Sequence, residues 1–301
     1  MNSFRFLFFI LAMFSANASK ICNVLSLSGG GSFGAVEVGI LDKIQLPKYD
    51  MITGISAGGL NAGFLSYFNS DKETMTAGVE NLKNIYFGLT NASVYNHNMF
   101  QVSRTWSFYD TTPLSKTIEK ELGKLTYTDG SKPTLIGSTN LNDGVLQIFQ
   151  FEKQPKLRQK EILMATSAIP LVFPPQIIGG KYYVDGGAIA NEIINGIEAY
   201  LNCDKYNITF ITASERLQSV ETINDLNDYV RRMAKVVMTD YNNELAEIIA
   251  NPCATGSKGV IHYCYPDSKE LENYSSLDFS FGKELYTIGY NHFKCEDFNY
   301  C

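Results

Sequence analysis

The chain of 301 residues lacks the sequence features of a membrane-spanning, nucleic-acid-binding or metal-binding protein. Its apolar run over residues 6–14 is too short to span a bilayer, and no other segment approaches the needed length. The formal net charge of −6 gives no sign of a basic surface for nucleic acid or anionic lipid. No cysteine pair has CxxC spacing and no histidine stands at ligand spacing, so no metal site is expected.

The sequence also lacks a Pro- or Ser-rich linker, an internal repeat and a low-complexity segment. Apolar residues make up 45% of the chain, which is enough for one continuous core. Large α/β sheets often exceed the usual domain length of ~150 residues without dividing. A single domain is therefore expected over residues 19–301, with residues 253–301 as its cysteine-rich C-terminal extension.

The first 18 residues are typical of a signal peptide. Arg5 precedes the short apolar run, and Ala16-Asn17-Ala18 has the small-residue pattern of a cleavage site. The mature protein is expected to begin near Ser19, and to be secreted or to lie in the lumen of the secretory or endolysosomal pathway. Three triplets that accept N-linked glycans agree with this route, and they begin at Asn91, Asn207 and Asn273.

Six cysteines follow the predicted cleavage site, and an even count in a secreted chain favours disulfides. The sequence alone allows 15 pairings. Four of the cysteines lie near the C-terminus, where local bridges are expected, and the other two would tie the first strand to a later helix end. The expected pairs are Cys253–Cys264, Cys295–Cys301 and Cys22–Cys203.

Two glycine-rich loops stand in a repeated strand–helix pattern. The apolar run Ile21–Leu27 predicts a strand, the loop 28–34 follows it, and apolar residues then recur at helical spacing as far as Ile44. A second strand is expected over Tyr49–Thr53 and a second helix over Ala57–Phe68. This order predicts a parallel sheet with right-handed crossovers, so both loops are expected at the carboxyl edge of the sheet.

The second loop, Gly54-Ile55-Ser56-Ala57-Gly58, has the pattern of a nucleophile elbow. Small residues on both sides let the backbone turn sharply enough to present a serine hydroxyl between a strand and a helix. The glycines of the first loop could aim bare N–H groups at a developing oxyanion. Either motif alone is weak, but their order within one strand–helix–strand–helix unit favours acyl-transfer chemistry.

The first loop also fits the dinucleotide fingerprint G-x-G-x-x-G, from Gly29 to Gly34. That function requires an acidic residue near the end of the second strand, where it would bind the ribose. Thr53 and Gly54 stand there, and Asp50 falls at the start of the strand. Nucleotide binding is therefore disfavoured.

A serine nucleophile needs a base, and the chain offers two kinds of candidate. One is a carboxylate: Asp185 ends an apolar strand and precedes Gly186-Gly187. If that strand is parallel to the others, Asp185 lies at the same edge as Ser56. From the residues alone, a capping or Asx-turn role for Asp185 is an equal alternative. The other kind is histidine, but no motif surrounds the three present, which are His97, His262 and His292.

Four ordered blocks between Leu25 and Asn191 resemble the patatin-like phospholipases. The blocks are Gly29–Gly34, Gly54–Gly58, Ala165–Pro175 and Asp185–Gly187. The resemblance implies an α/β fold with three layers, α/β/α, around a central, mostly parallel sheet. It also implies a Ser–Asp dyad without a catalytic histidine, in which Ser56 is the nucleophile and Asp185 the general base. The implied oxyanion hole consists of the backbone N–H groups of Gly29, Gly30, Gly31 and Gly34.

The same resemblance implies a lipid acyl hydrolase of the phospholipase A type, which cleaves ester bonds of phospholipids or related glycerolipids through an acyl-enzyme. Its partner would be lipid at a membrane or micelle surface, with no nucleic acid. No cofactor and no metal is implied, calcium included, because glycine N–H groups take the electrophilic role. Aromatic residues from Tyr86 to Tyr109, among them Trp106 and Phe108, are candidates for an acyl-chain groove and for lipid contact.

Two other functions remain open from the sequence. One is an esterase with a Ser-His-Asp triad, which is disfavoured because such folds usually have several strands before the elbow. The other is a secreted storage or binding glycoprotein with an unused dyad. The head group, the ester position and the oligomeric state are not encoded in any recognisable motif.

Overall fold

The computed structural model describes residues 19–45, 47–97, 106–127, 132–194, 196–213, 232 and 258–300. The predicted signal peptide, residues 1–18, lies outside the described residues, as do Cys253 and Cys301. The single domain over residues 19–301 stays a prediction.

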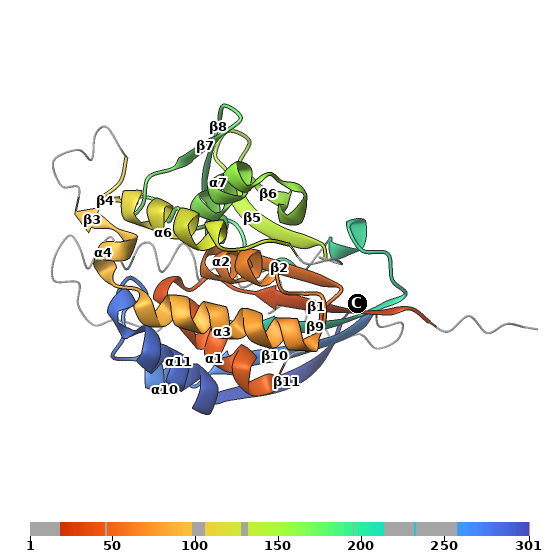
Figure 1. Cartoon of the computed structure of the whole chain (residues 1–301). Coiled ribbons are helices and arrows are strands. Elements are labelled where there is room, and N and C mark those ends of the chain that lie inside the picture. The colour runs from red at the N-terminus through yellow and green to blue at the C-terminus, as the bar shows by residue number, and fades with distance from the viewer. Residues whose placement is uncertain are drawn as a thin grey trace, which may run out of the picture.

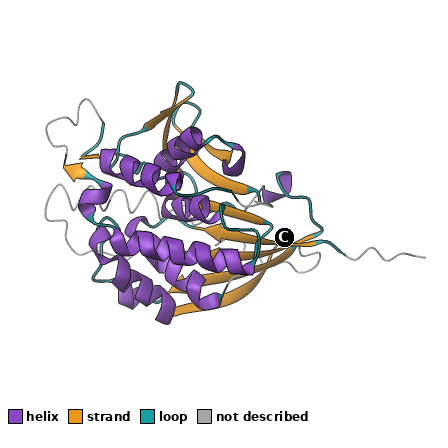
Figure 2. Ribbon diagram, in the orientation of Figure 1, coloured by secondary structure: helices purple, strands orange, loops and turns teal. Residues whose placement is uncertain are grey.

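Nine of the described strands form one mixed sheet (Figures 1 and 2). The strand order is β11-β10-β9-β1-β2-β5-β8-β7, with β6 paired to β5. The inner strands β10, β9, β1, β2 and β5 run parallel, and the antiparallel pairs lie toward the two sides. The bounds are β1 Ile21–Leu27, β2 Met51–Ile55, β5 Thr134–Asn140, β6 Val145–Gln150, β7 Gln176–Ile178, β8 Lys181–Asp185, β9 Lys205–Ile211, β10 Gly259–Pro266 and β11 Phe293–Tyr300. A separate pair joins β3 (Asn96–His97) to β4 (Tyr109–Asp110).

Helices cover one face of this sheet, where α1, α2, α3, α6, α7 and α11 lie in front of the strands in Figure 1. The helices in the described residues are α1 Gly34–Ile44, α2 Ser56–Leu65, α3 Lys72–Gly88, α4 Asn91–Val94, α6 Thr112–Gly123, α7 Lys156–Thr166, α10 Ser268–Leu271 and α11 Gly282–Asn291. Single 3-10 turns are η1 Gly31–Phe33, η2 Phe151–Lys153, η3 Gly186–Ala188, η4 Ile197–Ala199 and η5 Phe279–Phe281. The predicted α/β fold with three layers around a mostly parallel sheet is confirmed, and η4 belongs to the described part of the layer behind the sheet.

The alternation of side chains along the strands creates a core on each face of the sheet. On β1, Leu25 and Leu27 join the cluster that packs against the helices, whereas Val24 joins the cluster on the other face. That second cluster includes Ile193 and Ile194 from the segment before η4. Because β1 is buried on both faces, it reads as a continuous apolar run, which is why the sequence predicts its bounds correctly.

Strand β8 enters the sheet in the direction opposite to the one expected. Strand β2 lies along the first part of β5, with Ile55 beside Gly137, and β8 lies antiparallel along the second part, with Asp185 beside Ser138. The carboxyl ends of β2 and β8 therefore meet head to head at the middle of β5. The prediction that Asp185 ends a parallel strand is wrong, yet this geometry brings Asp185 to the same edge, beside Ser56.

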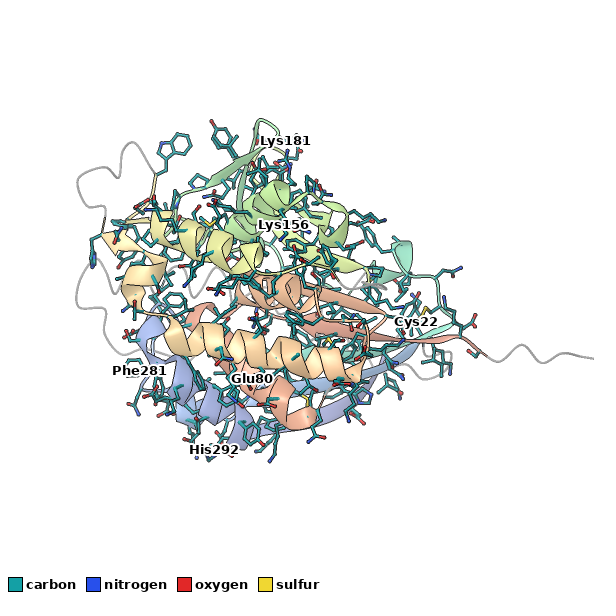
Figure 3. The ribbon with its side chains drawn as sticks, in the orientation of Figure 1. Cys22, Glu80, Lys156, Lys181, Phe281 and His292 are labelled. Carbon is teal, nitrogen blue, oxygen red and sulfur yellow. A yellow bond between two sulfur atoms is a disulfide. The ribbon has the colours of Figure 1, made fainter. Side chains whose placement is uncertain are left out.

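Two disulfides join described residues. Cys22 in β1 pairs with Cys203, as predicted, and is labelled in Figure 3. Cys264 pairs with Cys295, so the predicted local pairs Cys253–Cys264 and Cys295–Cys301 are wrong. The physical reason is the sheet register: β10 and β11 are antiparallel neighbours in which Cys264 lies directly opposite Cys295.

Candidate active site

Ser56 lies at a sharp turn between β2 and α2. Its φ angle is 55°, in the left-handed region that a non-glycine residue seldom adopts, and its side chain is buried. Small neighbours are required, because a Cβ on Gly54 would lie 2.2 Å from the Gly58 carbonyl oxygen. This strand–turn–helix geometry is that of a nucleophile elbow, and its strain is typical of a functional site.

Thr166, the last residue of α7, fixes this turn. Its Oγ1 accepts a hydrogen bond from the Ser56 N–H at 2.9 Å and donates one to the Gly137 carbonyl at 2.6 Å. The elbow is thereby tied to β5 at the point where β2 and β8 meet. Sequence reasoning missed this role, and the available signal was the place of Thr166 within the block Ala165–Pro175.

Asp185 ends β8, is fully buried, and faces Ser56. Its Oδ1 accepts the Gly187 N–H at 2.8 Å, which is the Asx-turn considered from the sequence, and it so caps η3. Its Oδ2 has no partner within hydrogen-bonding distance in the described part of the chain. Burial raises the pKa of Asp185 to about 7, while the Ser56 hydroxyl and the Gly187 N–H favour the charged form and act in the opposite direction.

The glycine loop runs past Ser56, since a Cβ on Gly29 would lie 3.1 Å from the Ser56 Cβ. The loop continues through η1 into α1, so its backbone N–H groups gather at a helix N-terminus, where they favour negative charge.

The four predicted oxyanion-hole N–H groups differ in their partners. The Gly29 N–H donates to Asn191 Oδ1 at 3.1 Å, and the Gly34 N–H donates to carbonyls of η1. Among the described residues, none accepts a hydrogen bond from the Gly30 or Gly31 N–H. Gly30 and Gly31 are therefore the two of the four whose N–H groups have no acceptor in the described part of the chain.

A buried polar network supports the loop from behind. Glu37 of α1 accepts the Ser28 N–H at 2.9 Å and Asn61 Nδ2 at 2.9 Å, and the Tyr86 hydroxyl donates to Asn61 Oδ1 at 3.0 Å. Burial raises the pKa of Glu37 well above its ordinary value, while the hydrogen bonds from Asn61 and Ser28 lower it. Sequence reasoning missed this network, whose signal is one acidic residue inside the apolar helix 35–41.

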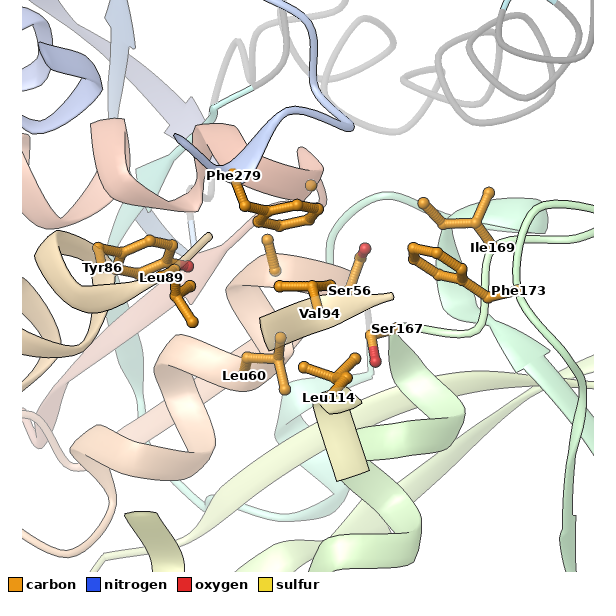
Figure 4. Close-up of a pocket in the computed structure, with 12 residues that line it drawn as sticks. Ser56, Leu60, Tyr86, Leu89, Val94, Leu114, Ser167, Ile169, Phe173 and Phe279 are labelled. Carbon is orange, nitrogen blue, oxygen red and sulfur yellow. The ribbon is translucent and has the colours of Figure 1, made fainter. Parts of the chain in front are cut away.

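Ser56 opens into a pocket whose walls are mostly apolar (Figure 4). Of the described members of the predicted aromatic set, Tyr86 lines it, whereas Trp106 and Phe108 are not among its lining residues. The other lining residues come from the helices α2, α4 and α6, the 3-10 turns η1 and η5, and the segments that follow α3 and α7. They are Gly31, Ala57, Leu60, Leu89, Val94, Leu114, Ser167, Ile169, Phe173 and Phe279.

None of the three histidines lines this pocket. His97 lies exposed on β3, and His262 on β10 places its Nδ1 2.7 Å from Asp297. His292 follows α11 and is exposed. The structure thus brings together Ser56, Asp185 and the glycine loop, and it leaves every histidine outside the group.

The described residues hold no cluster of three or more His, Cys, Asp or Glu side chains that could bind a metal ion. In the same part of the chain, no helix combines the length and the apolar character needed to cross a bilayer.

Comparison with known proteins agrees with this geometry. Two proteins named "cGAMP-activated phospholipase", from Vibrio cholerae and Escherichia coli, are each 29% identical to this chain, over 197 and 191 residues respectively. A "Probable lipid hydrolase 463L" from Invertebrate iridescent virus 6 is 25% identical over 182 residues. The match to the Vibrio cholerae protein covers 56% of this chain and 54% of that protein, and the match to the Escherichia coli protein covers 56% and 52%. The match to the viral protein covers 57% of this chain and 62% of that protein. The chain thus spans about half the length of the two bacterial relatives.

A crystal structure of VipD from Legionella pneumophila aligns over 92% of this chain and 68% of that chain, with a TM-score of 0.40 and 14% identity. The sequence model described as "Patatin-like phospholipase" matches residues 25–196, a span that includes the glycine loop, the elbow and Asp185. Because this match covers more than half of the chain, the chain belongs to the patatin-like phospholipase family.

Proposed function

We propose that this chain is a secreted lipid acyl hydrolase that cleaves ester bonds of phospholipids or related glycerolipids by a Ser56–Asp185 dyad. The observation that supports the proposal is that three features lie together at one edge of the sheet. These are a strained serine at an elbow, a buried carboxylate that faces it, and two glycine N–H groups without an acceptor among the described residues. Membership of the patatin-like phospholipase family supports lipid as the substrate class.

In the first step, the Ser56 hydroxyl oxygen attacks the ester carbonyl carbon while Asp185 takes the hydroxyl proton. Hydrogen bonds from the Gly30 and Gly31 N–H groups stabilise the negative charge that forms on the carbonyl oxygen. The tetrahedral intermediate then breaks its bond to the alcohol, which leaves with the proton held by Asp185. The acyl group stays on Ser56 as an ester.

In the second step, Asp185 takes a proton from a water molecule that attacks the acyl-enzyme. The tetrahedral intermediate collapses, the proton returns to the Ser56 oxygen, and the fatty acid is released. A carboxylate can serve as the base because burial raises the pKa of Asp185 to about 7, close to neutral pH. The apolar pocket beside Ser56 would hold the acyl chain.

Secretion is part of the proposal and rests on separate observations. Residues 1–18 have the signal-peptide pattern, and two disulfides join described parts of the chain. Glycosylation would follow from that route. Asn273 is the best acceptor because its side chain is exposed, whereas Asn207 lies within the sheet on β9.

The direct test uses purified protein, a fluorophosphonate probe and a panel of diacyl phospholipids, galactolipids and triacylglycerols. We expect the probe to label Ser56, and free fatty acid with the matching lysolipid to appear from at least one glycerolipid. Ser56→Ala should abolish both signals. Absence of labelling and of fatty-acid release in correctly folded protein would contradict the proposal and favour a binding glycoprotein.

A further inference from the structure

Three large apolar side chains are exposed close to one another in the fold. Trp106 is 56% exposed, Leu171 62% and Ile177 60%. Trp106 lies against Tyr182 of β8, with 5.7 Å between ring centroids. Ile177 of β7 lies directly opposite Tyr182 in the β7–β8 hairpin, so both side chains project from the same face of the hairpin.

Leu171 belongs to the same surface through the backbone. The Phe108 N–H, two residues after Trp106, donates to the Leu171 carbonyl at 2.9 Å. We call Trp106, Leu171, Ile177 and Tyr182 the hairpin patch.

Two members of the hairpin patch are held outward at an energetic cost. Trp106 has a φ of 57° and Leu171 a φ of 67°, both in the left-handed region. A non-glycine residue there costs roughly 1–2 kcal/mol. Both the backbone strain and the exposure of large apolar side chains to water reduce the stability of the fold. Each feature is typical of a site that binds a ligand or a partner surface.

The patch is continuous with the pocket beside Ser56. The Phe173 N–H donates to the Ile169 carbonyl at 2.8 Å, so these two residues lie one turn apart, and both line the pocket. Leu171 lies between them in sequence and is exposed. The turn 169–173 therefore has two pocket residues, Ile169 and Phe173, and one exposed residue of the hairpin patch, Leu171.

The described charges around the patch do not favour an anionic partner. Lys181, labelled at the tip of the hairpin in Figure 3, pairs with Asp143 at 2.6 Å. The whole chain has a net charge of −6. Anionic membranes attract clusters of basic side chains, whereas Trp and aliphatic residues enter a lipid interface without charge attraction.

We propose that the hairpin patch inserts into the interface of a neutral or zwitterionic lipid surface and holds the pocket mouth against it. This inference rests on the proposed function, because it names where the enzyme meets aggregated substrate. Lipid could then move from the surface to Ser56 along the turn 169–173 with its acyl chain kept out of water.

The chain carries a natural probe of this contact, since Trp106 is its single tryptophan. Purified full-length protein is mixed with phosphatidylcholine vesicles, and Trp106 emission is recorded with and without lipids brominated in their acyl chains. We expect the emission to move to shorter wavelength and to be quenched by the brominated lipid. Unchanged emission in the presence of vesicles that the protein hydrolyses would overturn the inference.

Two variants test the other side chains. Ile177→Asp places a charge in the patch, and Leu171→Asn removes an apolar side chain while fitting the left-handed backbone better than leucine. Each should weaken partitioning onto phosphatidylcholine vesicles about tenfold or more, because each deletes one large side chain from the buried interface. The matched control is Leu157→Asp, whose leucine is 72% exposed at the start of α7, at the far end of that helix from Leu171.

A water-soluble short-chain ester separates this inference from the proposed function. Ile177→Asp should cleave it at the wild-type rate while losing activity on vesicles, and Leu157→Asp should match wild type on both. Equal activity on vesicles for wild type, Ile177→Asp and Leu157→Asp would overturn the inference. Binding only to anionic vesicles, with that binding lost at high salt, would overturn it as well. Failure of wild type to cleave any ester, with Trp106 emission still shifted by vesicles, would instead contradict the proposed function.

Discussion

At the residue scale, the two carboxyl oxygens of Asp185 have different roles. Asp185 Oδ1 holds the start of η3 through the Gly187 N–H, so the side chain cannot swing away from Ser56 without breaking that contact. Its Oδ2 is left without a partner among the described residues. The structure therefore fixes one oxygen and leaves the other available, which is what a positioned base requires.

The ionisation of Asp185 should govern the pH dependence of ester hydrolysis. Only the carboxylate form can take the Ser56 proton, and burial raises its pKa to about 7. We expect kcat/KM on a soluble ester to rise as the pH increases through about 7 and to level off above it. A profile that is flat from pH 5 to pH 8 would show that Asp185 is not the base.

Asp185 should also lower the stability of the protein at alkaline pH. A carboxyl whose pKa is raised in the folded state stabilises the fold below its unfolded pKa, near 3.8, and this stability is lost as the pH rises through about 7. Asp185→Asn keeps an acceptor for the Gly187 N–H but cannot ionise. Its Tm should exceed the wild-type Tm at pH 8 and approach it at pH 4. A lower Tm for the variant at pH 8 would contradict this assignment.

At the element scale, the glycine loop is shaped by a segment far away in sequence. Gly31 has a φ of 58°, and a Cβ there would lie 2.1 Å from the Ser276 carbonyl oxygen, which accepts the Ser32 N–H at 2.7 Å. The segment before η5 thus fixes the loop that offers the Gly30 and Gly31 donors, although it lies outside the matched residues 25–196.

Alanine substitutions at two glycines should separate backbone strain from crowding. Gly31 and Gly179 both have a φ of 58°, but nothing lies within 4 Å of a Cβ at Gly179. Gly179→Ala should cost about 1 kcal/mol of unfolding free energy and leave activity intact. Gly31→Ala should cost at least about 1 kcal/mol more and reduce hydrolysis strongly, as measured by urea unfolding and ester turnover. Equal costs would mean that Ser276 does not confine the loop.

Elements whose signals are local could be predicted from the sequence. Strand β1, helix α1 and the elbow at Ser56 follow from apolar spacing and small residues, so their order and place are correct. The direction of β8 could not be predicted, because it is set by antiparallel pairing with β5, a strand that is distant in sequence. The hydrogen bonds of Thr166, Glu37 and Asn61 were missed for the same reason, since their partners lie on other elements.

At the scale of the whole molecule, the two disulfides between described residues close loops of very different length. Cys22–Cys203 spans 181 residues and ties β1 to the start of β9, and Cys264–Cys295 spans 31 residues across the antiparallel pair β10–β11. The first bridge encloses the elbow and Asp185, whereas the second lies wholly outside that loop.

Removal of the longer bridge should destabilise the protein more. The chain-entropy relation predicts a loss of about 5 kcal/mol for Cys22→Ser with Cys203→Ser, and about 4 kcal/mol for Cys264→Ser with Cys295→Ser. Urea unfolding of the two double variants measures the difference, and peptide mapping without reduction verifies the pairs. The reverse order of stability would contradict the loop-length argument.

The central claim is that Ser56 and Asp185 cleave lipid esters without help from histidine. The most direct measurement compares kcat/KM on one soluble ester and one phospholipid for Asp185→Asn and for the triple variant His97→Ala, His262→Ala and His292→Ala. We predict a loss of about a thousandfold or more for Asp185→Asn, and activity within a few-fold of wild type for the triple variant. Full activity in Asp185→Asn, or loss of activity in a folded triple-histidine variant, would contradict the account.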